Sequence, residues 1–91
     1  MVSKVTTVLN PSGIHARPAS LFVQCASGFK SSISVRDVTK DGDAKDAKSI
    51  LMVMSLGMAC GDQIEIVAEG EDESDALEAL VSLVDSGCGF M

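Results

Sequence analysis

The chain has 91 residues, of which 46% are apolar and 22% charged, so we expect one folded domain, residues 1–91, rather than a disordered segment. Its formal net charge of −6 argues against a general nucleic-acid binder, which would present a basic face. No apolar run reaches membrane-spanning length and no signal-peptide pattern opens the chain, so we expect a soluble cytoplasmic protein. Cys25, Cys60 and Cys88 share no metal-ligand spacing and are expected to be free thiols, with Cys25 helical and semi-buried.

The chain opens with a predicted strand and a turn. Residues 2–9 are rich in Val and Thr, and apolar Val5 and Leu9 are separated by polar residues, which favours a strand. Residues 10–13, Asn-Pro-Ser-Gly, form a dense turn signal that closes it.

The turn leads into a segment that holds the only histidine of the chain, His15. Gly13 lets the backbone adopt unusual dihedral angles and approach a ligand closely. Pro18 has no N–H and is best tolerated in a first helical turn, so we predict that a helix begins near Ala16. His15 would then stand at a helix N-terminus, where unpaired N–H groups and the helix dipole attract anions. Arg17 adds a planar fork suited to phosphate oxygens, and the arrangement favours reversible phosphorylation of the imidazole.

Other interpretations of His15 stay open on the residues alone. A lone histidine near a loop is most often a polar surface residue, although the neighbouring Gly, Arg and Pro favour phosphorylation here. Zinc usually needs three or four ligands, and the chain has no second histidine or paired Cys-x-x-Cys. A catalytic triad would need a nucleophile placed by the fold. No magnesium-binding carboxylates or glycine-rich nucleotide loop accompany the segment, so we expect no metal, no cofactor and a substrate of other enzymes rather than a kinase.

The predicted first helix carries a core stripe at helical spacing and ends near Gly28. The residues of this stripe are Ala19, Phe22, Val23 and Ala26. Residues 32–38 then alternate polar and apolar side chains, as a half-buried strand does, and Asp41-Gly42 is a favoured hairpin turn. Residues 43–47 are polar and indicate coil by themselves.

Residues 48–56 form a compact apolar segment closed by Gly57. Ile50 and Val53 suit an ordinary core helix, but a helix this short cannot bury its remaining apolar side chains as well. Clustered exposed apolar residues usually mark an interaction surface, and methionine suits surfaces that meet several partners. Ser49 stands where a helix N-cap is expected. Lys48 and Arg17 could form a local basic spot.

The last part of the chain predicts a strand and a helix. Ile64, Ile66 and Ala68 alternate with Gln63 and Glu65, which predicts a strand over residues 63–68 that Gly70 ends. Residues 71–75 are an acidic run of the kind found at a helix N-terminus, and Gly87 suits the position after the helix. The expected buried stripe consists of Leu77, Leu80, Val81 and Val84. The order strand, helix, strand, strand, helix, strand, helix favours an α+β fold with helices on one face of an antiparallel sheet.

Two segments together resemble one known family. Residues 13–19, Gly-Ile-His-Ala-Arg-Pro-Ala, closely resemble the active-site segment of HPr, the phosphocarrier of the bacterial phosphoenolpyruvate:sugar phosphotransferase system. Residues 48–57, Lys-Ser-Ile-Leu-Met-Val-Met-Ser-Leu-Gly, resemble the regulatory-serine region of the same family. The resemblance implies an open-faced β-sandwich with a four-stranded antiparallel sheet, three helices on one face and a short strand within residues 43–47. The hairpin at residues 39–47 is about three residues longer than in the family.

The resemblance also implies roles for particular residues. His15 would accept the phosphoryl group through Nδ1, with Arg17 and the N–H of Ala16 holding the phosphate and Pro18 starting the helix. Ser49 would be the serine that HPr kinase/phosphorylase modifies, which makes the protein a corepressor for a catabolite-control transcription factor. A partner surface would include Ser20, Lys48, Ile50, Leu51, Met52 and Met54.

The same resemblance implies the partners. Enzyme I would donate the phosphoryl group and sugar-specific Enzyme IIA domains would receive it, with the carrier acting as a monomer that neither inserts into membranes nor binds nucleic acid directly. The alternative is a purely regulatory HPr-like protein that acts through Ser49. The known regulatory paralogue lacks the active histidine, so the presence of His15 favours the carrier.

Overall fold

The computed structural model describes residues 1–11, 13–14 and 16–87. It contains four strands and three helices in the order expected from the sequence. They are β1 (Val2–Thr7), α1 (Ala16–Ser27), β2 (Ser32–Asp37), β3 (Lys45–Asp46), α2 (Ile50–Ser55), β4 (Gln63–Glu69) and α3 (Glu73–Asp85).

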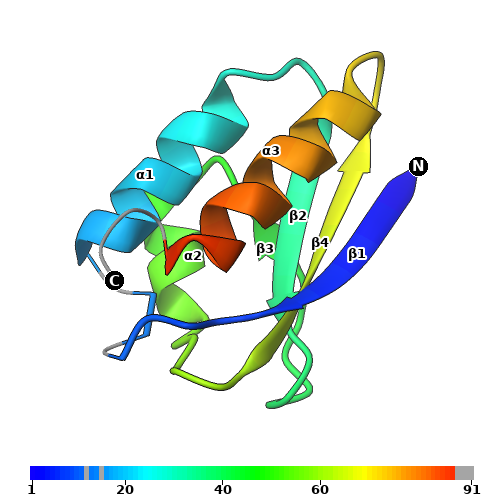
Figure 1. The fold of residues 1–91 in the computed structure, drawn as a ribbon. Coiled ribbons are helices and arrows are strands. Elements are labelled where there is room, and N and C mark those ends of the chain that lie inside the picture. Colours follow the sequence, from blue (N-terminus) through cyan, green and yellow to red (C-terminus); the bar gives the residue numbers. More distant parts are fainter. Residues whose placement is uncertain (12, 15, 88–91) are drawn as a thin grey trace.

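The strands form one antiparallel sheet in the order β1-β4-β2-β3. Within it, β1 is paired along its whole length with β4, from Val2 opposite Ala68 to Thr7 opposite Gln63, and β4 pairs with β2 on its other side. All three helices lie on one face of this sheet, and the other face is open (Figure 1). The expected α+β open-faced sandwich is confirmed.

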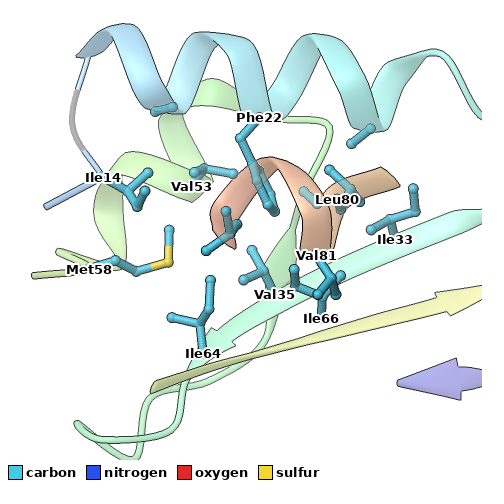
Figure 2. Close-up of a cluster of buried hydrophobic side chains, with 14 of the residues drawn as sticks. Ile14, Phe22, Ile33, Val35, Val53, Met58, Ile64, Ile66, Leu80 and Val81 are labelled. Carbon is cyan, nitrogen blue, oxygen red and sulfur yellow. The ribbon is translucent and has the colours of Figure 1, made fainter. Parts of the chain in front are cut away.

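The core lies between the sheet and the helices because each element has one apolar side. Phe22 from α1, Leu80 from α3 and Val53 from α2 meet Val35 and Ile66 of the sheet, all of them fully or almost fully buried (Figure 2). In the two predicted helical stripes, Val23 and Leu77 are only half-buried at the margin of this core. The single buried side chain of α2 is Val53.

Several boundaries and faces differ from the sequence prediction. β1 ends at Thr7 rather than at residue 9 and β2 at Asp37 rather than at residue 38, while β3 is a two-residue strand within residues 43–47. In the first strand, Val5 is exposed and Thr6 is buried, where its hydroxyl donates to the Asp85 carboxylate at the end of α3. Val5 and Leu9, which marked this strand in the sequence, are both exposed, whereas the buried face of the strand carries Thr6 with its hydrogen bond to Asp85.

The acidic run lies at the N-terminus of α3, as predicted, with Glu73 and Asp75 in the first turn, and Asp72 makes an additional contact with a distant segment. Asp72 precedes the helix, yet its side chain makes no N-cap hydrogen bond. It accepts from the Lys30 amide at 2.9 Å and from the amide and hydroxyl of Ser31 at 2.9 and 2.5 Å. Hydrogen bonds from the Ser31 hydroxyl and then the Lys30 amide lower the pKa of Asp72 to about 2. This carboxylate thus joins the start of α3 to the connection between α1 and β2.

Candidate functional site

The loop before α1 is held by backbone hydrogen bonds on both sides. The Gly13 amide donates to the Asn10 carbonyl at 2.8 Å, and the Ile14 amide donates to the Met58 carbonyl at 2.8 Å. Gly13 has φ of +75°, and a Cβ at this position would lie less than 3.0 Å from the Met58 carbonyl oxygen. The predicted unusual dihedral angle of Gly13 is confirmed, and the close approach that the structure shows is to the Met58 carbonyl of the same chain rather than to a ligand.

Side-chain packing anchors the same loop at one end of the core. Ile14 is 4% exposed and Met58 is 3% exposed, and both lie beside Val53 of α2 (Figure 2). His15 and Ser12 lie outside the described residues. The chain on both sides of residue 15 is nevertheless fixed, by buried Ile14 before it and by α1 after it.

The start of α1 has the properties of an anion-binding helix terminus. The helix begins at Ala16 as predicted, and Pro18 is buried in its first turn, where a missing N–H costs no hydrogen bond. Ala16 and Arg17 are exposed, and the first turn contains no acidic residue. The first amides of any helix lack an intrahelical partner, so this end can bind an oxyanion with the guanidinium beside it. Ser20 is half-buried one turn later.

The second predicted site segment forms a short helix with an unusual exposure pattern. Ser49 is the N-cap residue of α2, and its hydroxyl accepts from the Met52 amide at 3.4 Å. The other large apolar side chains of the helix are exposed, namely Ile50 at 37%, Leu51 at 78%, Met52 at 46% and Met54 at 44%. The prediction that α2 cannot bury its apolar residues is confirmed. The suggestion that Ile50 belongs to the core is wrong, because only Val53 faces it.

The basic spot suggested for Arg17 and Lys48 does not form. Lys48 Nζ donates at 2.8 Å to the carbonyl of Phe29, which follows the C-terminal end of α1. Arg17 lies at the opposite end of α1. A helix of that length spans about 18 Å, so the two cations are held far apart. The order of contacts shows that α2 runs antiparallel to α1, with its start beside the end of α1 and its end beside Ile14.

Other residues near the loop carried no clear signal in the sequence. Asn10 is 3% exposed, and its amide donates at 2.7 Å to the carbonyl of Gly87, which ties the loop to the end of α3. Gly87 has φ of +70° after the helix, as predicted. Asn10 was read only as a turn residue, because asparagine is common in turns and a contact across 77 residues leaves no local pattern.

The described residues contain no group of three or more histidine, cysteine or carboxylate side chains that could hold a metal ion. Nor does any helix among them have the length and apolar character needed to cross a membrane. Cys25 is half-buried in α1, where burial raises the pKa of its thiol, and Cys60 is exposed; both are free. Cys88 lies outside the described residues. A thiol with a raised pKa is a poor nucleophile, so Cys25 suits a packing role.

The comparisons with known proteins agree with this geometry. The family model described as "PTS HPr component phosphorylation site" matches residues 2–86. The phosphocarrier protein HPr of Treponema pallidum is 49% identical over 84 residues, which is 91% of each chain. The HPr-like protein Crh of Bacillus subtilis is 43% identical, over 92% of this chain and 95% of its own length. The crystal structure of HPr-C-His from Thermoanaerobacter tengcongensis superimposes with a TM-score of 0.90 at 46% identity, covering 98% of this chain and 97% of that one.

Proposed function

Because this chain belongs to the HPr family of the phosphotransferase system, we propose that His15 accepts a phosphoryl group from Enzyme I and passes it to sugar-specific Enzyme IIA domains. The observation that supports this most directly is the exposed, carboxylate-free N-terminus of α1, which begins one residue after His15 and carries Arg17. In this proposal the protein is a single-domain cytoplasmic monomer, and its partners supply the catalysis.

The proposed chemistry needs few groups. The neutral imidazole of His15 attacks phosphorus through the Nδ1 lone pair, a P–N bond forms, and the bond from phosphorus to the donor's leaving atom breaks. Negative charge on the equatorial oxygens is stabilised by the amides of Ala16 and Arg17 and by the guanidinium. The step runs in reverse on the acceptor, so the phosphate must not be held too tightly. One arginine and an exposed helix end satisfy both requirements.

The test is transfer of ³²P from phosphoenolpyruvate in the presence of Enzyme I. We expect one acid-labile phosphate, assigned by mass spectrometry to His15 and absent from His15→Ala. A phosphate found on another residue would refute the carrier function, whereas loss of labelling in a folded His15→Ala variant supports it.

The exposed side chains of α2 suit the surface that these partners would cover. Leu51 is the most exposed of them, and with Ile50, Met52 and Met54 it forms an apolar surface on a helix that contributes one side chain to the core. Ser20 and Lys48 lie at its margins in this proposal, on the neighbouring α1 and before α2. A small apolar centre with a polar rim suits a transient interface.

A regulatory function through Ser49 is the second candidate, supported by the similarity to Crh and by the position of the hydroxyl. A phosphate at a helix N-terminus is electrostatically favoured, so HPr kinase/phosphorylase could modify Ser49 without unfolding α2. The modified protein would then serve as corepressor for a catabolite-control transcription factor. If Ser49 is phosphorylated by that kinase while His15 accepts nothing from Enzyme I, the purely regulatory function replaces the carrier function.

A further inference from the structure

A buried pair of aspartates lies where β2 ends and β4 begins. Asp37 is 1% exposed and Asp62 is 8% exposed. Oδ1 of Asp37 accepts from the Lys40 amide at 3.1 Å, whereas the buried Oδ2 receives no hydrogen from any N–H or O–H group of the described residues. Leaving a buried carboxylate oxygen without a donor is costly, which favours a protonated Asp37 carboxyl beside the neighbouring Asp62.

The charges around this pair balance. Burial raises the pKa of Asp37, and its hydrogen bond with Asp62 raises it further, while the same hydrogen bond lowers the pKa of Asp62. These directions favour the proton on Asp37 and the negative charge on Asp62. Lys40, from the connection between β2 and β3, lies with Nζ 3.4 Å from Asp62 Oδ2. With the proton on Asp37, the group of one carboxylic acid, one carboxylate and one ammonium is neutral.

This group holds the segment between α2 and β4, which runs along the lower edge of Figure 1. Lys40 Nζ donates to the Gly57 carbonyl at the end of α2, and Asp62 Oδ2 accepts from the Ala59 amide at 3.1 Å. The residue between them is Met58, whose carbonyl binds the Ile14 amide. Direct contacts thus lead from Lys40 and Asp62, through residues 57–59, to the residue that precedes His15.

We propose that Lys40 and Asp62 are positioning residues for the loop that carries His15, acting through residues 57–59, with Asp37 supplying the proton that joins it to Asp62. The inference deepens the proposed function, since it assigns a task to residues that do not touch the phosphoryl group. The titratable groups that face one another here are Asp37 from β2, Lys40 from the following connection and Asp62 before β4; the end of α2 contributes only the Gly57 carbonyl.

The test compares Lys40→Met with Lys4→Met, a matched loss of one positive charge at an exposed position of β1. Two quantities are measured on the full chain: amide hydrogen exchange by NMR, and the rate of ³²P transfer from Enzyme I. In Lys40→Met we expect the Ile14 and Ala59 amides to exchange roughly ten-fold faster or more, because a hydrogen bond to a charged group is lost. The Ile66 amide in central β4 should keep its protection. Transfer should slow through kcat rather than KM, and Lys40→Arg should restore it.

The outcomes separate this inference from the function on which it rests. If the Ile14 amide exchanges at the same rate in Lys40→Met and Lys4→Met, the proposed contact of Lys40 with residues 57–59 is refuted. If the Ile66 amide accelerates as much as the Ile14 amide in Lys40→Met, Lys40 contributes only to global stability. Faster Ile14 exchange with unchanged transfer would refute positioning. If the unsubstituted protein accepts no phosphate on His15, the carrier function fails, while hydrogen exchange still reports whether the contact exists.

A second pair of variants tests where the proton lies. Asp37→Asn keeps an acceptor for the Lys40 amide and gives Asp62 an N–H donor in place of the O–H, so Ile14 exchange should stay within about two-fold of the unsubstituted protein. Asp62→Asn removes the charge that faces Lys40 and should reproduce the Lys40→Met pattern. The reverse sensitivity, with Asp37→Asn the more disruptive variant, would overturn the assignment.

Discussion

The close approach of Gly13 to the Met58 carbonyl predicts a large and local effect of a single methyl group. Gly13→Ala forces an L-residue to φ of +75° and places Cβ less than 3.0 Å from the carbonyl oxygen and 3.0 Å from Ala59 Cα. The left-handed backbone costs about 1–2 kcal/mol, and overpacking against backbone adds about 1–3 kcal/mol. Their sum predicts a loss of about 2–5 kcal/mol in the free energy of unfolding.

Gly61→Ala is the matched control, because it isolates the backbone contribution. Gly61 has φ of +89°, and a Cβ there would meet nothing within 4 Å. We therefore expect this variant to lose only about 1–2 kcal/mol. Urea denaturation of both variants, followed by circular dichroism, measures the difference, and for a domain of this size each kcal/mol lowers Tm by about 4–8 °C.

The same pair of variants links stability to function. Gly13→Ala must move either its own loop or residues 58–59, so phosphorylation of His15 should slow even where the protein is fully folded. Gly61→Ala should transfer phosphate at a normal rate. Equal losses of unfolding free energy in the two variants would refute the argument from the Met58 contact, and would leave only backbone conformation as the reason for glycine at position 13.

Three further predictions concern other parts of the molecule. Hydrogen bonding holds the pKa of Asp72 at about 2, below its ordinary 3.8, so the stabilisation from its carboxylate should be complete above pH 4 and fade as pH falls toward 2. Free energies of unfolding measured against pH should therefore show Asp72→Asn less stable than the unsubstituted protein at pH 7. The two proteins should become equally stable near pH 2. Arg17→Ala should slow phosphoryl transfer roughly ten-fold or more, because a charge-assisted phosphate contact is worth about 1.5–3 kcal/mol, and it should change Tm little because the side chain is exposed. Timed ³²P assays and a melting curve measure the two effects, and an unchanged transfer rate would contradict the phosphate contact. Leu51→Gln should weaken Enzyme I binding by calorimetry roughly five-fold or more, whereas Val5→Gln, an exposed apolar position on β1, should not; equal affinities would exclude α2 from the interface.

Local patterns in the sequence predicted most of the fold because most elements here obey simple rules. Alternation of polar and apolar residues marked β4, and helical spacing marked α1 and α3. The glycines at positions 57 and 87 followed the ends of their helices with φ of +61° and +70°. The α2 segment was recognised because its apolar residues outnumber the positions that one and a half turns can bury. These are properties of neighbouring residues, and the sequence displays them directly.

The features that sequence reasoning missed depend on contacts between distant residues. Asp72 was predicted only as part of an acidic run at a helix N-terminus, but its carboxylate also binds Lys30 and Ser31, about 40 positions away. Lys40 and Asp62 carried no functional signal in the sequence, although their side chains form an ion pair. The suggested pairing of Arg17 with Lys48 failed for the same reason, since it required knowing that α2 runs antiparallel to α1.

That antiparallel arrangement determines how a phosphate on Ser49 could affect His15. Ser49 begins α2 beside the end of α1, about one helix length of 18 Å from Ala16, the first residue of α1. Two unit charges at that distance interact by about 0.2 kcal/mol through water, and screening at physiological ionic strength reduces this below about 0.1 kcal/mol. A direct effect through solvent on the start of α1 is therefore small, which favours inhibition through a partner that covers α2. Ser49→Asp should slow phosphorylation of His15 by Enzyme I but leave phosphorylation by a small donor such as phosphoramidate unchanged. Equal slowing with both donors would show that the charge acts within the chain, and would contradict the separation of the two sites.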